Sequence, residues 1–233
     1  RRQRQMCIRD SGNNGRTELV FVVDRSGSMG GLESDTIGGF NSMLSKQRTI
    51  AGECRVTTLL FDHRIETLHN HLDIREVNDL TSRDYWVRGS TALLDAIGLA
   101  IDRMIVTQRH TAAAYRAQHV LFVIITDGYE NASRRYSLHQ IKQMITYERE
   151  RYHWEFVFLG ANIDAEQTAG DFGISPRCAT DFHADGQGIK ASFEAVACAA
   201  TAVRGGADLD DLSAPDFLGG VRDDYRSRRR MKR

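Results

Sequence analysis

The stretch Leu19-Val20-Phe21-Val22-Val23-Asp24-Arg25-Ser26-Gly27-Ser28 passes from a continuous apolar run into a loop rich in oxygen-bearing side chains. The same transition recurs in Val120-Leu121-Phe122-Val123-Ile124-Ile125-Thr126-Asp127-Gly128. Runs that are apolar on both faces are typical of strands in a parallel sheet covered by helices. In such sheets ligands bind beyond the carboxyl ends of the strands, where the strand order switches. The sequence therefore predicts Asp24 and Asp127 at one edge of a sheet, and close together if their strands are neighbours.

The rest of the chain alternates further strands with helical patterns. Strands are expected at 55–61 and 156–159, with a short strand near 64–68 that forms an antiparallel hairpin edge. Apolar residues recur at intervals of three and four around 37–44, 94–105, 138–145 and 189–203. Ser137 with Gln140, and Asp164 with Gln167, are typical of helix starts. The pattern predicts an α/β fold: a doubly wound, mostly parallel sheet sandwiched by helices, with one short antiparallel edge strand.

Oxygen donors in three separate segments predict a metal site. The predicted ligands are Asp24, Ser26, Ser28, Thr91 in Gly89-Ser90-Thr91-Ala92, and Asp127. Carboxylate and hydroxyl oxygens suit a hard divalent cation such as Mg²⁺, which usually keeps several waters. Three of the five donors are neutral hydroxyls, so the cation would keep much of its charge and an open position. Such a metal is suited to bind a carboxylate from another molecule.

This donor pattern, D-x-S-x-S followed by a distant Thr and a distant Asp, resembles the metal-ion-dependent adhesion site of von Willebrand factor type A (vWA) domains. The resemblance extends over roughly 17–203, and the segments 17–40 and 154–163 resemble stand-alone bacterial vWA proteins. It implies a vWA or Rossmann-like fold and a bound Mg²⁺ or Mn²⁺. In that family the Thr and the second Asp exchange direct and water-mediated metal contact between closed and open forms. The alternative is a serine-rich strand-to-helix turn with incidental capping residues, in which Thr91 caps a helix over 92–108.

The predicted function is divalent-metal-dependent protein binding, in which the metal captures an Asp or Glu of a partner protein. We expect no enzyme activity, no catalytic residues and no organic cofactor. The alternatives are a metal-dependent phosphoesterase and an adaptor subunit of an ATPase machine. Tyr85, Trp86 and Arg88 precede the Thr91 loop and are either exposed rim anchors for a protein ligand or packed beneath the loop. Arg25 either meets an acidic partner or is only solvated.

Composition limits the other classes of function. Between the basic ends of the chain, Gly15 to Tyr225 holds 21 basic and 30 acidic residues, which argues against a broad nucleic-acid surface. No apolar run approaches the ~18 residues that span a bilayer, and no signal-peptide core is visible, so we expect no membrane partner and a cytoplasmic protein. The cysteines show no paired spacing, which indicates reduced thiols. His69-Asn70-His71 is expected on a surface loop and not in a second metal site.

Three regions are predicted along the chain. Met6-Cys7-Ile8-Arg9-Asp10-Ser11 reads like a translated sequencing-transposon end, so residues 1–14 are interpreted as a disordered artefact. Residues 15–204 are expected to form the vWA domain. Residues 205–233 pass from Gly205-Gly206 through an acidic stretch to a basic end, which indicates a flexible tail.

Overall fold

The computed structural model describes residues 15–213 and 215–231 of the 233-residue chain. The predicted artefact at 1–14 lies outside them. The strands are β1 (Thr17–Asp24), β2 (Cys54–Phe61), β3 (Ile65–Asp73), β4 (His119–Thr126), β5 (Glu155–Gly160) and β6 (Ala179–Asp181). The helices are α1 (Glu33–Arg48), α2 (Leu93–His110), α3 (Leu138–Tyr152), α4 (Ala165–Phe172), α5 (Gly186–Arg204) and α6 (Gly219–Met231), with 3-10 turns η1 (Gly27–Met29), η2 (Ala113–Tyr115) and η3 (Pro176–Cys178).

The strands form one sheet in the order β3-β2-β1-β4-β5-β6. All neighbouring pairs are parallel except β2 with β3, which is antiparallel. The strand order reverses at β1, whose two neighbours are β2 and β4, so β1 and β4 flank the switch point. The predicted fold class, including the antiparallel edge strand, is confirmed.

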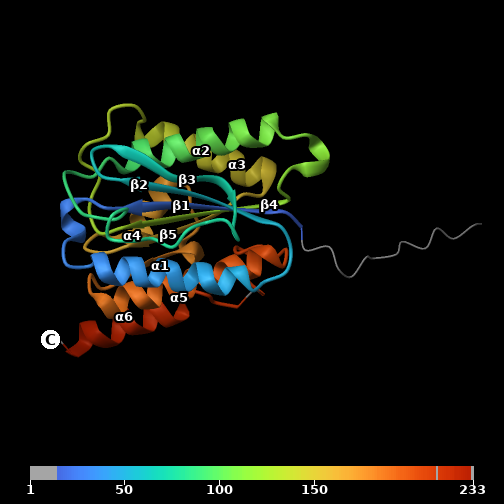
Figure 1. Ribbon diagram of the computed structural model, residues 1–233. Helices are drawn as coiled ribbons and strands as arrows, with labels where there is room; N and C mark the ends of the chain where they lie inside the picture. Colours follow the sequence, from blue (N-terminus) through green and yellow to red (C-terminus); the bar gives the residue numbers. More distant parts are fainter. Residues whose placement is uncertain (1–14, 214, 232–233) are drawn as a thin grey trace, which may run out of the picture.

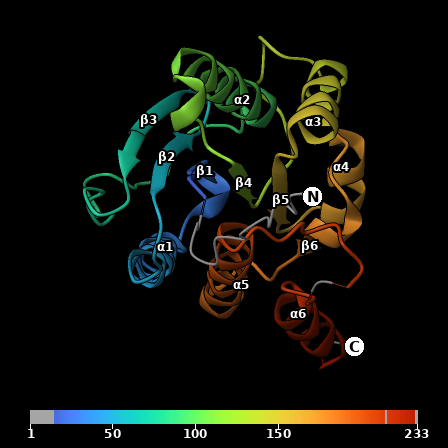
Figure 2. The same ribbon diagram turned by 90° about the vertical axis from the view of Figure 1, so that its right-hand side faces the viewer.

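Helices cover both faces of the sheet. Helices α2 and α3 lie above it and α1, α5 and α6 below it (Figure 1), and the turned view separates the same layers, with α4 beside α3 (Figure 2). All eight residues of β1 are buried, as are seven of the eight in β4. Because both faces are covered, the central strands need apolar residues at every position, which explains their continuous runs.

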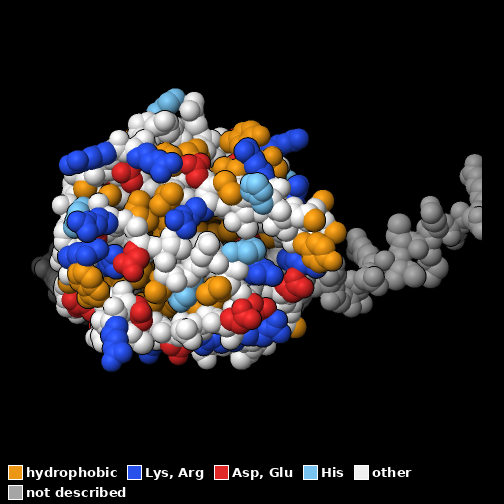
Figure 3. Space-filling model, turned by 45° about the horizontal axis from the view of Figure 1, so that its top comes forward, with side chains coloured by type: hydrophobic (Ala, Val, Ile, Leu, Met, Phe, Trp, Pro, Cys, Tyr) orange, Lys and Arg blue, Asp and Glu red, His pale blue; other side chains and the backbone are white. Residues whose placement is uncertain are grey.

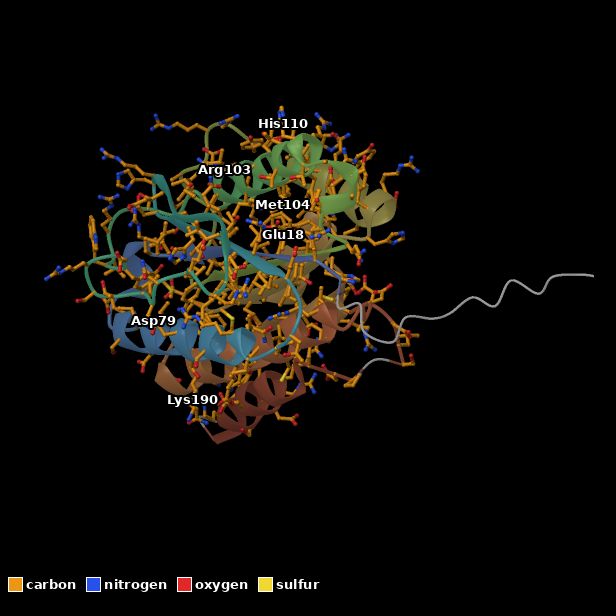
Figure 4. All side chains as sticks on the ribbon, turned by 45° about the vertical axis from the view of Figure 1, so that its right-hand side comes forward. Glu18, Asp79, Arg103, Met104, His110 and Lys190 are labelled. Atoms are coloured by element: carbon orange, nitrogen blue, oxygen red, sulfur yellow. The ribbon has the colours of Figure 1, made fainter. Side chains whose placement is uncertain are left out.

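Labelled side chains show how α2 lies on the sheet (Figure 4). Met104 is buried, and Glu18 of β1 lies below it in the same view. Arg103 and His110 lie on the outer side of the helix. On the opposite face of the sheet, Lys190 lies on the outer side of α5. Helix α2 therefore has an apolar face toward the sheet and a polar face toward solvent, as its spacing predicts.

Helix starts agree with the sequence. Ser137 and Gln140 form the expected capping box of α3, and the Asp164 carboxylate accepts a hydrogen bond from the Gln167 N–H at the start of α4. Helices α1 and α5 approach closely at Gly39, where an added Cβ would lie 2.4 Å from Cδ2 of Phe193.

The prediction of a flexible tail from residue 205 is wrong over most of its length. Helix α6 packs against α5 and β6, and the apolar side chains Leu209, Leu218 and Val221 are buried. Arg228 pairs with Asp185, the N-cap residue of α5. The sequence pattern failed here because only a few apolar residues anchor a helix whose exposed faces are strongly charged.

The histidine pair is placed differently from the prediction as well. His69 and His71 lie within β3, which extends to Asp73, and not on a surface loop. His69 is buried, with Nδ1 3.0 Å from the Thr58 hydroxyl, and Nδ1 of His71 lies 2.8 Å from Oε1 of the buried Glu18. His69 therefore makes a buried polar contact between β3 and β2.

Candidate metal centre

The two predicted aspartates lie at the carboxyl ends of adjacent strands. In the β1–β4 register Val23 pairs with Ile125, so Asp24 ends its strand level with Thr126 and directly beside Asp127. The Asp24 carboxylate is fully buried and accepts hydrogen bonds from the Ser26 N–H (2.6 Å) and the Thr126 hydroxyl (2.6 Å). Burial raises the pKa of Asp24, and these hydrogen bonds oppose the rise. The carboxylate is thereby fixed in one orientation.

The loop after Asp24 turns its two serine hydroxyls toward each other. Residues 27–29 form the 3-10 turn η1, and the Ser26 and Ser28 hydroxyl oxygens lie 2.9 Å apart. The Gly27 N–H donates to the Gly89 carbonyl at 3.1 Å, which ties this loop to the segment that carries Thr91. Ser26 is buried and Ser28 is exposed. The loop therefore presents one hydroxyl from inside the site and one from its open side.

Thr91 reaches the same place from the loop before α2. A Cβ added at Gly128 would lie 3.2 Å from the Ser28 hydroxyl oxygen and 3.5 Å from that of Thr91, so the three predicted segments meet there. Thr91 is not the N-cap of the following helix: α2 begins at Leu93, and its N-cap residue Ala92 provides no side-chain bond. The Thr91 hydroxyl is thus free of the capping role that the sequence left open.

The Asp127 carboxylate is buried with neither oxygen hydrogen-bonded among the described residues. Burial, and to a smaller extent the charge of Asp24, raise the pKa of Asp127 to about 6, although the nearby Ser28 hydroxyl opposes the shift. A buried carboxylate without a partner costs free energy. A hard cation beside it would supply the missing interaction and reverse the local effect on the pKa. The five donors therefore fit a divalent cation.

The donor set is poor in carboxylates. Within residues 15–213 and 215–231 no group of three or more His, Cys, Asp or Glu side chains could hold a metal ion. The candidate centre instead combines two carboxylates with three hydroxyls. Such a set gives a divalent cation few charged ligands and leaves it dependent on water or an outside ligand for further oxygen atoms.

A buried ion network underlies the rim of the centre. Arg25 is fully buried, which excludes both sequence interpretations of it as a surface residue. Its Nε lies 3.2 Å from Oδ2 of the buried Asp62, and the Arg88 Nε lies 2.7 Å from the same oxygen. The backbone N–H of Arg88 also donates to the Arg25 carbonyl. Asp62 thus holds together the loops after β1 and before α2.

Tyr85 and Trp86 divide between the two predicted roles. Tyr85 is buried, and its hydroxyl donates to the Asp24 carbonyl at 2.5 Å, so it packs beneath the loop. Trp86 is 42% exposed, with the guanidinium of Arg88 4.4 Å and that of Arg25 5.5 Å from its ring centroid. Of these three residues, Trp86 and Arg88 therefore lie at the accessible rim and Tyr85 does not.

Side chains other than the five predicted ligands position the loops of the centre. Asn131 accepts the Thr91 N–H through its side chain, and the Glu130 carboxylate accepts the N–H groups of Leu94, Ala132 and Ser133. Asp62 follows β2 as Asp24 follows β1, so the same strand-end reasoning could have found it. Thr126 directly precedes Asp127, but its bond to Asp24 depends on strand pairing.

Comparison of the sequence with protein-family models and with curated proteins finds no match. Solved structures do resemble the fold. Proximal thread matrix protein 1 from the mussel byssus matches with a TM-score of 0.54 at 14% identity over 80% of this chain and 46% of that one. The same protein "with zinc occupied MIDAS motif" matches with a TM-score of 0.56 at 16% identity, over 80% of this chain and 46% of that one. Manganese-loaded Plasmodium vivax TRAP protein matches with a TM-score of 0.50 at 16% identity, over 77% of this chain and 72% of that one.

These likenesses show a vWA fold. The chain spans less than half the length of the mussel protein that it matches. Two of the neighbouring structures carry a divalent metal, zinc in one and manganese in the other. Among the described residues no helix is long and apolar enough to cross a membrane.

Proposed function

We propose that this protein is a divalent-metal-dependent protein-binding module and not an enzyme. Asp24, Ser26, Ser28, Thr91 and Asp127 would hold Mg²⁺ or Mn²⁺, and an Asp or Glu of a partner protein would complete the coordination. The observation that carries the proposal is the buried Asp127 carboxylate, which has no hydrogen-bond partner among the described residues, next to Gly128, where the Ser28 and Thr91 hydroxyls meet. The bound cation would act as a Lewis acid toward the partner's carboxylate.

The surroundings support binding of an anionic ligand. Arg88 and Trp86 lie at the rim of the centre, and an arginine beside an exposed aromatic ring is a frequent anchor in protein interfaces. With two carboxylates and three neutral hydroxyls, the site would not repel a third carboxylate as strongly as an all-acidic site would. We also propose a cytoplasmic location, since the cysteines Cys54, Cys178 and Cys198 are unpaired.

Metal binding is tested first, by calorimetry and thermal unfolding. Mg²⁺ or Mn²⁺ should bind the wild-type protein and raise its melting temperature by mass action. Asp24→Ala and Ser26→Ala should each remove most of that shift. Asp164→Ala is the matched control, because Asp164 follows the neighbouring strand β5 but caps α4. Retention of wild-type metal affinity in both site variants would refute the metal centre.

Carboxylate capture is tested with Mn²⁺ as a probe of bound water. Water on the bound Mn²⁺ relaxes solvent protons, and a carboxylate that enters the open position displaces it. A short peptide that contains Glu should therefore lower the relaxation rate, and the same peptide with Gln should not. If both peptides change the relaxation rate equally while metal binding is intact, the metal is structural and the carboxylate-capture hypothesis is rejected.

The partner itself is sought by pull-down with wild-type protein, Thr91→Ala, and wild type plus EDTA. Recovery of one partner only with metal-loaded wild type supports the proposal, and equal recovery in all three contradicts it. Phosphatase turnover with Mg²⁺ or Mn²⁺ tests the phosphoesterase alternative. Genome neighbourhood tests the ATPase-adaptor alternative.

A further inference from the structure

A second cleft lies at the opposite end of the sheet from the metal centre. It has a volume of about 180 Å³ and lies between the C-terminal turns of α2 and α3 and the residues that lead into β4 and β5. Pockets for drug-sized ligands usually measure about 300–1,000 Å³. The cleft therefore suits a single ring system, with the remainder of a ligand outside it. Nothing in the proposed metal-dependent function uses it.

Three aromatic side chains form one side of the cleft. Trp154 is buried and stacks on the core ring of Phe122, with ring centroids 5.5 Å apart. Tyr152 lies 6.4 Å from Trp154 and 6.0 Å from Tyr147, and the two tyrosines are 53% and 56% exposed. Trp154 is held by the core, whereas the tyrosines extend into solvent. The Tyr152 and Trp154 rings are inclined by 43° and the Tyr147 and Tyr152 rings by 68°, so a flat ligand can stack on one exposed tyrosine ring at a time.

Glu148 lines the cleft with a buried carboxylate. Its residue exposure is 3%, and its Oε2 has no hydrogen-bond partner among the described residues. Burial raises the pKa of Glu148, and the charge of Arg109 opposes the rise. Each unsatisfied buried polar group in a native protein requires an explanation, such as an absent ligand. An N–H donor on a ligand would satisfy this oxygen.

The charges around the cleft define the ligand further. Arg109 and Arg116 line it from exposed positions, and the Arg116 Nε is held by the Thr111 carbonyl at 3.0 Å. Figure 3 views the molecule obliquely from the side of α2 and shows Lys and Arg side chains beside hydrophobic ones, with acidic side chains among them. Two positive charges beside one negative charge disfavour a simple cation. They favour a ligand with N–H donors at one end and an anionic group at the other.

We propose that this cleft binds a mononucleotide, with the base on the aromatic wall, its N–H groups toward Glu148 and its phosphate toward Arg109 and Arg116. Guanine fits best, because its ring N–H and its exocyclic amino group are adjacent donors that one carboxylate can accept together. Stacking on aromatic side chains is common to all bases, so the carboxylate provides the selectivity. The site is independent of the metal centre.

The test uses Trp154 fluorescence in the full chain with the background substitution Trp86→Phe. The chain has two tryptophans, so only Trp154 then reports. GMP should change the fluorescence saturably, and guanosine and AMP should bind more weakly. Glu148→Gln should weaken GMP binding at least about tenfold, as expected for loss of a charged hydrogen bond. Glu150→Gln, an exposed neighbour on α3, should leave it unchanged.

Arg109→Gln should remove most of the difference in binding affinity between GMP and guanosine, because that difference in affinity comes from the phosphate contact. The melting temperature of each variant checks the fold, and if Glu148→Gln does not fold, Tyr152→Ala takes its place with a similar expected loss of affinity. The absence of saturable binding at millimolar GMP overturns the proposal. The proposal is also overturned if the Glu148→Gln protein binds GMP with the wild-type affinity, or if tryptophan or inorganic phosphate binds as tightly as GMP.

Discussion

Asp62→Ala should destabilise the protein far more than loss of a surface carboxylate would. The Asp62 carboxylate is fully buried and accepts from the Arg25 and Arg88 guanidiniums and from the Arg64 N–H at 2.7 Å. Although burial raises the pKa of Asp62, the hydrogen bonds and charges of these donors lower it overall. Removal of one partner from a buried ion pair typically costs ~3–5 kcal/mol, because the remaining charge stays buried.

The structure places the expected cost near the lower end of that range. The Arg25 side chain is 1% exposed and cannot be solvated, but it keeps a contact of 2.8 Å with Glu66. The Arg88 side chain is 30% exposed and can turn toward water. We therefore expect a loss of about 3 kcal/mol in the free energy of unfolding.

Urea unfolding measures this cost, with equal m-values as the check that the unfolding transition is unchanged. Glu66→Gln is the control: the Glu66 side chain is 55% exposed, and Asp62 still pairs with Arg25 when Glu66 is replaced, so we expect a cost of only ~0–1 kcal/mol. If Asp62→Ala costs no more than Glu66→Gln, then the network does not hold the two loops together and the reasoning fails.

Three further predictions concern other parts of the fold. Gly39→Ala should cost ~1–3 kcal/mol of unfolding free energy, because the added Cβ overpacks against Phe193. Gly38→Ala is the control and should stabilise the protein by ~0.5–1 kcal/mol, because an added Cβ there meets nothing within 4 Å. Equal effects of the two substitutions in chemical denaturation would contradict the close approach of α1 and α5. Burial and the neighbouring Asp208 and Asp210 charges raise the pKa of Glu155 from its ordinary 4.5 to about 7. Between these pH values the folded protein keeps a proton on Glu155 that the unfolded chain releases. The free energy of unfolding should therefore fall as pH rises from 4.5 to 7. Glu155→Gln should flatten that part of the curve of unfolding free energy against pH, and an unchanged slope would reject the shift. Leu218→Ala should cost ~2–5 kcal/mol because the side chain is fully buried where α6 docks, and a cost near zero would show that the C-terminal segment does not stabilise the domain.

The sequence predicted most of the sheet and the composition of the candidate centre. Continuous apolar runs identify buried parallel strands directly, since every side chain of β1 and β4 meets a helix layer or a neighbouring strand. The aspartate after each run then falls at the same edge of the sheet. Whether Asp24, Ser26, Ser28, Thr91 and Asp127 bind a metal stays a prediction, but the structure brings these residues together.

Other features depended on contacts between residues far apart in the chain. Arg25 is charged, and nothing in its local sequence indicates that Asp62 would meet it 37 residues later in a buried site. Tyr85 and Trp86 are adjacent aromatics, yet one supports the Asp24 carbonyl and the other is exposed. Local patterns report how apolar a segment is, but they do not report which partner neutralises a buried charge.

The sequence by itself thus determined the alternation of strands and helices, the antiparallel edge and the oxygen-rich loops, because these follow from periodicity and from residue chemistry. Only the tertiary structure decided that α6 docks on the domain, that Arg25 is buried, and that Glu148 lies beside three aromatic rings in a cleft. The physical reason is that burial of a polar group is favourable only when distant partners compensate for lost hydration. Those partners are chosen by the packing of the whole chain.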